Sequence, residues 1–224
     1  MAYPRSSRPL AKSVVLLVLA ALTVTVSGAG ADYNLVQNPG FESPDLDGWP
    51  SRYYSMATSG LDNWNIPYGI VHLRADCPPN SGAQSLELLD HYLGCISQNL
   101  ATVAGGTYNL SFAMTGDFAY AYDRTVQVWW GGVPLGTFIA TRPTGWDPST
   151  NMGWTIRSGG ILSGLTASGP STELGFTGLN QDQFYGALLD DISVTSSSVP
   201  EPGSLSLLLL ALPGVAWLRR RRRA

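Results

Sequence analysis

Side chains able to act as catalytic bases are scarce in this chain of 224 residues. His72 and His91 are its two histidines, the residue type that most often accepts a proton near neutral pH. Neither lies in a Gly-x-Ser-x-Gly or similar triad motif. His91 follows Asp90, but neighbours on a strand point to opposite faces, so we interpret His91 as a loop residue. The sequence therefore gives no sign of a nucleophile activated by histidine.

Paired carboxylates are the other route to hydrolysis, because glycosidases take an acid and a base from distant strands. Glu87, Asp117 and Asp123 are the candidate partners, but residues 32–198 contain only three glutamates and nothing in their spacing favours a pair. A phosphate-binding loop and a His/Cys metal cluster are also missing from the sequence. We therefore expect that the protein is not an enzyme, with a glycan-cleaving domain as the less favoured alternative.

Aromatic side chains offer a different chemistry, because a flat ring with a polar handle can stack on a sugar as well as fill a core. Residues 32–198 contain six tryptophans and nine tyrosines, most of which we expect in the core. Trp129 is the best candidate for a ligand contact, since it alternates with Val128 and Trp130 and shares a face with polar neighbours. An arginine or a tyrosine nearby could add hydrogen bonds to sugar hydroxyls. The predicted ligand-binding group is Trp129, Gln127, Arg124, Tyr120 and Tyr122.

The segments that must position these side chains are typical of β-strands. Short runs of alternating apolar and polar residues recur between clusters of Gly, Pro, Asn and Asp. Gly105-Gly106 and Gly131-Gly132 provide turns where a positive φ is easily adopted. No amphipathic stretch of helical length interrupts the pattern. We predict an all-β fold, a jelly-roll β-sandwich, with strands at 84–90, 95–100, 107–114, 124–130, 172–177 and 188–194.

Charge separates the middle of the chain from its ends. Residues 32–198 carry five arginines against fifteen aspartates and glutamates, whereas Lys12 is the only lysine of the chain. An acidic surface of this kind repels nucleic acid and anionic lipid, and it is compatible with a divalent cation. We therefore expect no nucleic-acid partner.

The two cysteines, Cys77 and Cys95, both fall in this middle region. If the region is exported, it folds in an oxidising compartment where an even number of cysteines predicts a disulfide. A Cys77–Cys95 bond would close a loop of about eighteen residues and stabilise the fold by about 3 kcal/mol in the chain-entropy model. Two free thiols are the alternative.

The N-terminus has the three parts of a secretion signal. Basic residues precede an apolar run over 14–26, which is shorter than the roughly 20 residues needed to span a bilayer. The run ends in Ala29-Gly30-Ala31, which fits the small-residue rule for signal peptidase. We expect cleavage after Ala31, with an uncleaved anchor as the alternative.

The C-terminus combines three features in order, namely Pro200-Glu201-Pro202, an apolar run over 205–218 and an arginine cluster. A helix over that run would reach about 21 Å, short of the ~30 Å hydrocarbon core. This order resembles the PEP-CTERM sorting signal, which implies recognition by an exosortase-type processing enzyme at the inner membrane. An ordinary tail anchor is the alternative. The positive-inside rule keeps the membrane-stop residues in the cytoplasm; these are Arg219, Arg220, Arg221, Arg222 and Arg223.

The middle region begins and ends with recognisable motifs. It opens with Leu-Val-Gln-Asn-Pro-Gly-Phe-Glu at 35–42, closes with Gly-Ala-Leu-Leu-Asp-Asp-Ile-Ser-Val at 186–194, and has Gly-Cys-Ile-Ser-Gln at 94–98 between them. This combination resembles the galactose-binding-like β-sandwiches. It is most similar to the choice-of-anchor C proteins, to a plant cell-wall family of unassigned activity and to some carbohydrate-binding modules. The resemblance implies a jelly roll whose first and last strands meet.

The same resemblance implies a structural calcium ion, because the related modules often hold one where those strands meet. Calcium takes six to eight oxygen ligands. Glu42, Asp190 and Asp191 are the candidate metal ligands, although neighbours on a strand point apart, so only one of the two aspartates could face the ion directly. The alternative is a solvated strand end without a metal.

These observations predict an exported protein in four parts: a signal peptide at 1–31, a β-sandwich at 32–195, a linker at 196–199 and a sorting tail at 200–224. It would reach the cell surface or extracellular matrix after a transient stay at the inner membrane. The predicted function is non-catalytic binding of carbohydrate or matrix polysaccharide. A structural surface protein that acts by protein–protein contacts is the main alternative.

Overall fold

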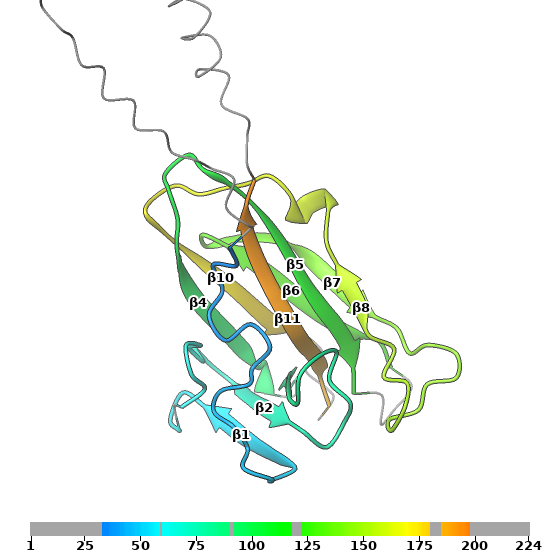
Figure 1. Ribbon diagram of the computed structural model, residues 1–224. Coiled ribbons are helices and arrows are strands. Elements are labelled where there is room, and N and C mark those ends of the chain that lie inside the picture. The colour runs from blue at the N-terminus through cyan, green and yellow to red at the C-terminus, as the bar shows by residue number, and fades with distance from the viewer. Residues whose placement is uncertain (1–32, 59, 90–91, 118–121, 180–184, 198–224) are drawn as a thin grey trace, which may run out of the picture. The chain divides into compact units, whose positions relative to one another are not determined.

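The computed structural model describes residues 33–197 except 59, 90–91, 118–121 and 180–184. The described chain forms two antiparallel sheets that pack into a β-sandwich (Figure 1), which confirms the predicted fold class. The larger sheet has the order β1 (Ser51–Ser55), β2 (Ile70–Arg74), β3 (Ser85–Leu88), β11 (Ala187–Ser196), β5 (Thr107–Gly116) and β8 (Thr155–Arg157), and β9 (Leu165–Thr166) also pairs with β5. The smaller sheet has the order β4 (Cys95–Ala101), β10 (Ser171–Gly178), β6 (Arg124–Trp130) and β7 (Val133–Ala140).

The predicted terminal segments fall outside the described residues. These are the signal peptide over 1–31 and the sorting tail over 200–224, with its apolar run. Within the part of the chain that is described, no helix is long and apolar enough to cross a membrane. A single turn of 3-10 helix, η2, spans Gly160–Leu162.

The core lies between the two sheets and follows from the alternation of side chains along each strand. On β6, Val126, Val128 and Trp130 are buried, whereas the residues between them face outward. Phe112 of the larger sheet meets Phe176 of the smaller sheet edge to face, with ring centroids 5.2 Å apart. The alternation read from the sequence therefore assigns the inner face of these strands correctly.

The beginning and end of the described chain meet, as the resemblance implies. The N–H of Leu35 donates to the carbonyl of Val194 at 2.9 Å, and the N–H of Ile192 donates to Pro39 at 3.0 Å. Asn34 adds a side-chain bond, since its Nδ2 donates to the carbonyl of Ile192 at 2.9 Å. The motif at 35–42 is thus held along the last strand, β11.

Five strands lie where the sequence predicts none, namely β1, β2, β7, β8 and β9. β7 contains Pro134 and Gly136, two residues that argue against a strand in the middle of a sheet. Both residues are tolerated because β7 is at the edge of the smaller sheet and pairs only with β6. The other four strands are short or lack a clear alternation of apolar and polar residues. They form because a neighbouring strand pairs with them, which the sequence pattern does not reveal.

The predicted Cys77–Cys95 disulfide is wrong, because both cysteines are free and buried. Cys77 packs against Met152 and Leu188 on the outer face of the larger sheet. Cys95 begins β4 of the smaller sheet, where its sulfur accepts a hydrogen bond from Thr177 Oγ1 at 3.4 Å. The sandwich core separates the two thiols. Burial raises the pKa of Cys77 to about 11 and also raises that of Cys95, so neither thiol is a reactive one.

Candidate functional site

A groove of about 260 Å³ runs over the outer face of the smaller sheet, and Trp129 lines it. Trp129 pairs with Gly175 of β10, which in turn pairs with Ser97 of β4. Because glycine has no side chain, the strip of sheet between the indole and Ser97 stays open. Tyr68, 46% exposed, also lines the groove. We call this site, lined by Trp129, Tyr68, Gly175, Ser97 and Thr177, the aromatic groove.

Polar groups accompany the two rings of the aromatic groove. The hydroxyls of Tyr68 and Thr177 lie 3.3 Å apart and share a hydrogen bond, and burial raises the pKa of the Tyr68 phenol. The exposed side chain of Glu173 also lines the groove. The groove thus combines aromatic faces with hydroxyl and carboxylate groups, the arrangement that can hold a sugar ring and its hydroxyls.

The other members of the predicted ligand-binding group do not line this groove. Gln127 lies on the same outer face, but its Nε2 donates to the carbonyl of Gly136 at 2.8 Å and so ties β6 to β7. Arg124 is fully buried, which makes its prediction as a surface ligand contact wrong. Its Nε and Nη2 donate to the backbone carbonyl of Asp117. Tyr122 is exposed just before β6, and Tyr120 lies outside the described residues.

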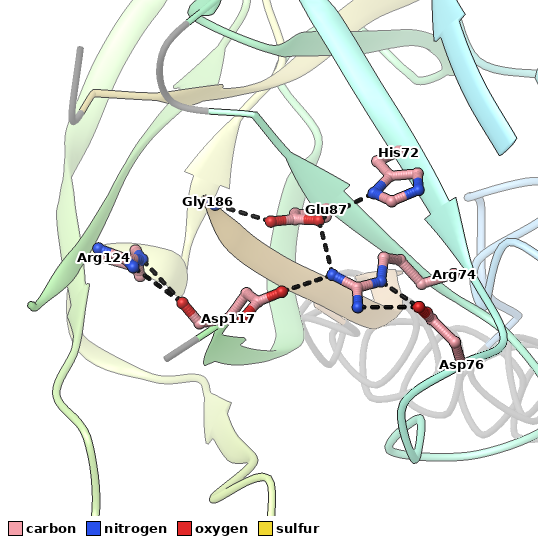
Figure 2. A network of polar contacts seen from close by, with 7 residues as sticks. All are labelled: His72, Arg74, Asp76, Glu87, Asp117, Arg124 and Gly186. Carbon is pink, nitrogen blue, oxygen red and sulfur yellow. Dashed lines mark hydrogen bonds and ion pairs between the residues drawn. The ribbon is translucent and has the colours of Figure 1, made fainter. Parts of the chain in front are cut away.

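A second group of polar residues lies on the outer face of the larger sheet, and Figure 2 shows it together with Arg124 of the smaller sheet. His72 on β2 pairs in register with Glu87 on β3, and His72 Nδ1 lies 3.1 Å from Glu87 Oε2. Arg74, two residues further along β2, donates from Nη1 to the same Glu87 oxygen at 3.0 Å. The N–H of Gly186 donates to the other Glu87 oxygen at 2.8 Å. Glu87 is thus fully buried, and both of its carboxylate oxygens have hydrogen-bond partners.

Arg74 joins this buried carboxylate to two further ones (Figure 2). Its Nη1 donates to Asp117 at 2.5 Å, and its Nε and Nη2 donate to the two oxygens of Asp76 at 2.7 and 3.1 Å. Burial alone would lower the pKa of Arg74, but the hydrogen bond to Asp76 and the charge of Glu87 raise it well above its ordinary value. We call His72, Arg74, Asp76, Glu87 and Asp117 the Arg74 network.

Two of the candidate catalytic carboxylates, Glu87 and Asp117, belong to the Arg74 network. Glu87 and Asp117 contact the same guanidinium, so they are neutralised together rather than opposed across a cleft. Asp123 is exposed just before β6. The sequence signal for the network is the spacing of His72 and Arg74 on one face of a strand, but it becomes visible only when β3 is placed beside it.

The three predicted metal ligands gather beside one loop. Asp190 Oδ2 accepts the backbone N–H groups of Asn80 at 2.8 Å and Ser81 at 3.1 Å. Asp191 accepts the Asn80 Nδ2 at 2.7 Å and the Ser81 hydroxyl at 2.6 Å. Both aspartates face this loop because the ladder of β11 shifts register after Asp190 and Asp191 adopts a positive φ of 47°. The expectation that only one of them could do so is therefore wrong.

Glu42 completes the group, which we call the acidic junction. Its Oε1 accepts the N–H groups of Ala83 at 2.9 Å and Gln84 at 3.1 Å. A Cβ placed on Gly40 would lie 3.4 Å from Asp190 Oδ1 and 3.8 Å from an oxygen of Asp191, so the glycine leaves room between the carboxylates. Burial, with the neighbouring Asp191 charge, raises the pKa of Asp190 to about 7 despite its backbone donors.

The acidic junction has the oxygen donors that calcium prefers. However, most of these carboxylate oxygens already accept N–H or O–H groups. Within the described ranges, no group of three or more His, Cys, Asp or Glu side chains is arranged to hold a metal ion. As the structure has it, the junction ties the 80–84 loop to the first and last segments of the sandwich.

Comparison with solved structures gives distant likenesses to carbohydrate-binding modules. TmCBM61 in complex with β-1,4-galactotriose has 14% identity and a TM-score of 0.45, over 74% of this chain and 100% of that one. A family 35 module from Clostridium thermocellum has 15% identity and a TM-score of 0.43, over 66% and 98%. CBM36 in complex with calcium and xylotriose has 18% identity and a TM-score of 0.40, over 64% and 99%.

Comparison by sequence gives one informative result. No curated protein matches the chain. A family model described as "Protein of unknown function (DUF642)" matches residues 34–195. The match covers the described sandwich from its first bonded segment almost to the end of β11.

Proposed function

This chain belongs to the DUF642 family, whose function is unknown, and we propose that its β-sandwich binds carbohydrate at the aromatic groove without cleaving it. The observation that carries the proposal is the placement of Trp129 on the outer face of the smaller sheet, opposite a glycine and in the same groove as Tyr68. An indole placed there does not fill the core. It offers an apolar face beside polar groups, which suits the two kinds of surface on a sugar ring.

The negative charge of the β-sandwich indicates whether the bound sugar is charged or neutral. Glu173 lines the aromatic groove, and acidic residues outnumber arginines three to one over residues 32–198, at fifteen against five. A carboxylated or sulfated polymer would be repelled at low ionic strength. The proposed ligand is therefore a neutral polysaccharide.

Co-sedimentation of the purified chain with insoluble polysaccharides tests the proposal. We expect saturable retention on at least one neutral glycan and none on a charged polymer. Assay of reducing ends in the same tubes is expected to show no release of sugar. Retention on none of the glycans would favour the alternative of a surface protein that acts by protein–protein contacts, and released sugar would favour a glycan-cleaving domain.

Export and surface sorting are part of the proposal. The supporting observations are the signal-like segment ending at Ala31, the Pro200-Glu201-Pro202 motif and the arginine cluster that follows. Signal peptidase would cut after Ala31, and an exosortase-type enzyme would act at the motif. Mass spectrometry of the protein extracted from the producing cells is expected to give a chain that starts at Asp32. A mass that includes residues 1–31 would contradict the cleavage.

Calcium at the acidic junction stays a prediction. Glu42, Asp190 and Asp191 would supply carboxylate oxygens, and the remaining ligands would be carbonyl or water oxygens. We expect calcium to raise the melting temperature and a chelator to lower it, because an ion that binds only the folded state stabilises that state. Asp190→Asn is expected to remove the response. A melting curve that calcium and chelator leave unchanged would show that the carboxylates act as hydrogen-bond acceptors only.

A further inference from the structure

A pocket of about 700 Å³ lies on the outer face of the larger sheet, above the Arg74 network. Its walls include Tyr53, Tyr92 and Tyr185, which are 60%, 46% and 37% exposed as whole residues. Its polar lining includes His72, Arg74, Asp76 and Glu87. A concave site with aromatic walls and a few converging polar groups is the usual form of a small-ligand site. We call it the His72 pocket.

The ring nitrogen Nε2 of His72 has no hydrogen-bond partner among the described residues, although it is buried. The His72 residue as a whole is only 7% exposed. A buried polar atom without a partner is costly, and a bound ligand or water molecule can supply the missing partner. The ring of Tyr53 stacks on the imidazole at 3.9 Å and 8°. Tyr53 is mostly exposed, so its ring forms a wall of the pocket beside the imidazole.

The partner of Nδ1 determines what Nε2 can do. Glu87 accepts hydrogen bonds from Arg74 and Gly186, so we treat it as an acceptor toward His72 Nδ1, which lies 3.1 Å away. We therefore assign the proton of the neutral imidazole to Nδ1. In the neutral imidazole, Nε2 then carries a lone pair and accepts a hydrogen bond. A ligand hydroxyl has the donor that this nitrogen lacks.

The charges around the pocket disfavour an anion. The network of Figure 2 contains three carboxylates, those of Asp76, Glu87 and Asp117, against the guanidinium groups of Arg74 and Arg124. Arg74 already donates to all three carboxylates, so it has little capacity left to bind an acidic ligand.

We propose that the His72 pocket is a second ligand site, which takes a neutral, hydroxyl-rich sugar unit whose hydroxyl donates to His72 Nε2. The choice of a sugar rests on the proposed function, whereas the site itself does not depend on the aromatic groove. The pocket lies on the outer face of the larger sheet and the groove on that of the smaller sheet. One domain can then hold two glycan chains at once, which gives a matrix protein the means to cross-link polysaccharide.

Nuclear magnetic resonance of the full-length chain, labelled with ¹⁵N at histidine, tests the second site. The chain has two histidines, so the His72 signals are assigned by their loss in His72→Gln. The probes are cellobiose, xylobiose and mannobiose, with digalacturonic acid as the charged control. We expect one neutral disaccharide to shift the Nε2 signal of His72 in a saturable way, in the wild type and in Trp129→Ala alike. Digalacturonic acid should leave it in place.

Two variants measure the strength of this site independently of the groove. His72→Gln is expected to weaken binding of that disaccharide to the pocket by tenfold or more, and Tyr53→Ala by several-fold. Tyr53 is exposed, so that variant stays informative if His72→Gln does not fold. A His72 signal that no neutral disaccharide moves overturns the second site and leaves the groove untouched. A response lost in Trp129→Ala overturns it as well, since there would be one site only.

Discussion

Trp129→Ala is expected to remove the part of polysaccharide retention that the aromatic groove provides, while hardly changing the melting temperature. The indole lines the aromatic groove on the outer face of β6 and is not part of the core. Loss of a central aromatic contact typically costs 2 kcal/mol or more of binding free energy, which raises the dissociation constant about thirtyfold. Substitutions on an outer face usually change stability by about 0.5 kcal/mol, or 1–2 °C for a domain of this size. Co-sedimentation and thermal melting of the same preparations measure both quantities.

Trp130→Ala is the matched control, because it removes the same residue type at the next position. Trp130 is 5% exposed, and its Nε1 donates to the carbonyl of Thr166 at 2.9 Å. We expect this variant to lose about 3–5 kcal/mol of stability through the cavity and the unpaired carbonyl. If Trp129→Ala destabilised the protein as much as Trp130→Ala does, the Trp129 ring would be a structural element and the groove would lose its ligand contact.

The contrast between these two tryptophans was available from the sequence. A strand alternates its faces, so of two neighbouring aromatic residues one must point away from the core. The apolar partners Val126 and Val128 assign Trp130 to the core and leave Trp129 outside. Tyr68 and Gly175 could not be found in this way, because they come from a loop and from β10, which meets β6 only in the folded sheet.

Long-range placement explains the wrong predictions too. Cys77 and Cys95 are close in sequence, but the chain between them forms β3 and then crosses from the larger to the smaller sheet. The error at Arg124 has a local cause instead: strand alternation already puts it on the inner face with Val126, where it meets the backbone of Asp117. At the acidic junction, a shift of register after Asp190 brings two neighbouring carboxylates to one loop, an irregularity that no periodic pattern contains.

Arg74→Ala is expected to be the most destabilising change of a charged side chain among the variants considered. The guanidinium holds the carboxylates of Glu87, Asp117 and Asp76, and the side chain of Glu87 is only 1% exposed. Removing one partner of a buried ion pair leaves an uncompensated charge, which typically costs about 3–5 kcal/mol. For a domain of this size the melting temperature should fall by about 10 °C or more. Arg52→Ala on the exposed side of β1 is the control and should change it by 1–2 °C at most.

A compensating variant shows whether charge or packing is the cause of this loss. Arg74→Met keeps an unbranched side chain in place, and Glu87→Gln with Asp117→Asn removes two of the carboxylates that lose the Arg74 guanidinium. Replacing a buried charged network by neutral side chains of similar size is often close to neutral. We therefore expect the triple variant to melt well above Arg74→Met alone. If it melts lower, the carboxylates have a stabilising role apart from Arg74, and the hydrogen bond from Gly186 to Glu87 is the contact that would account for it.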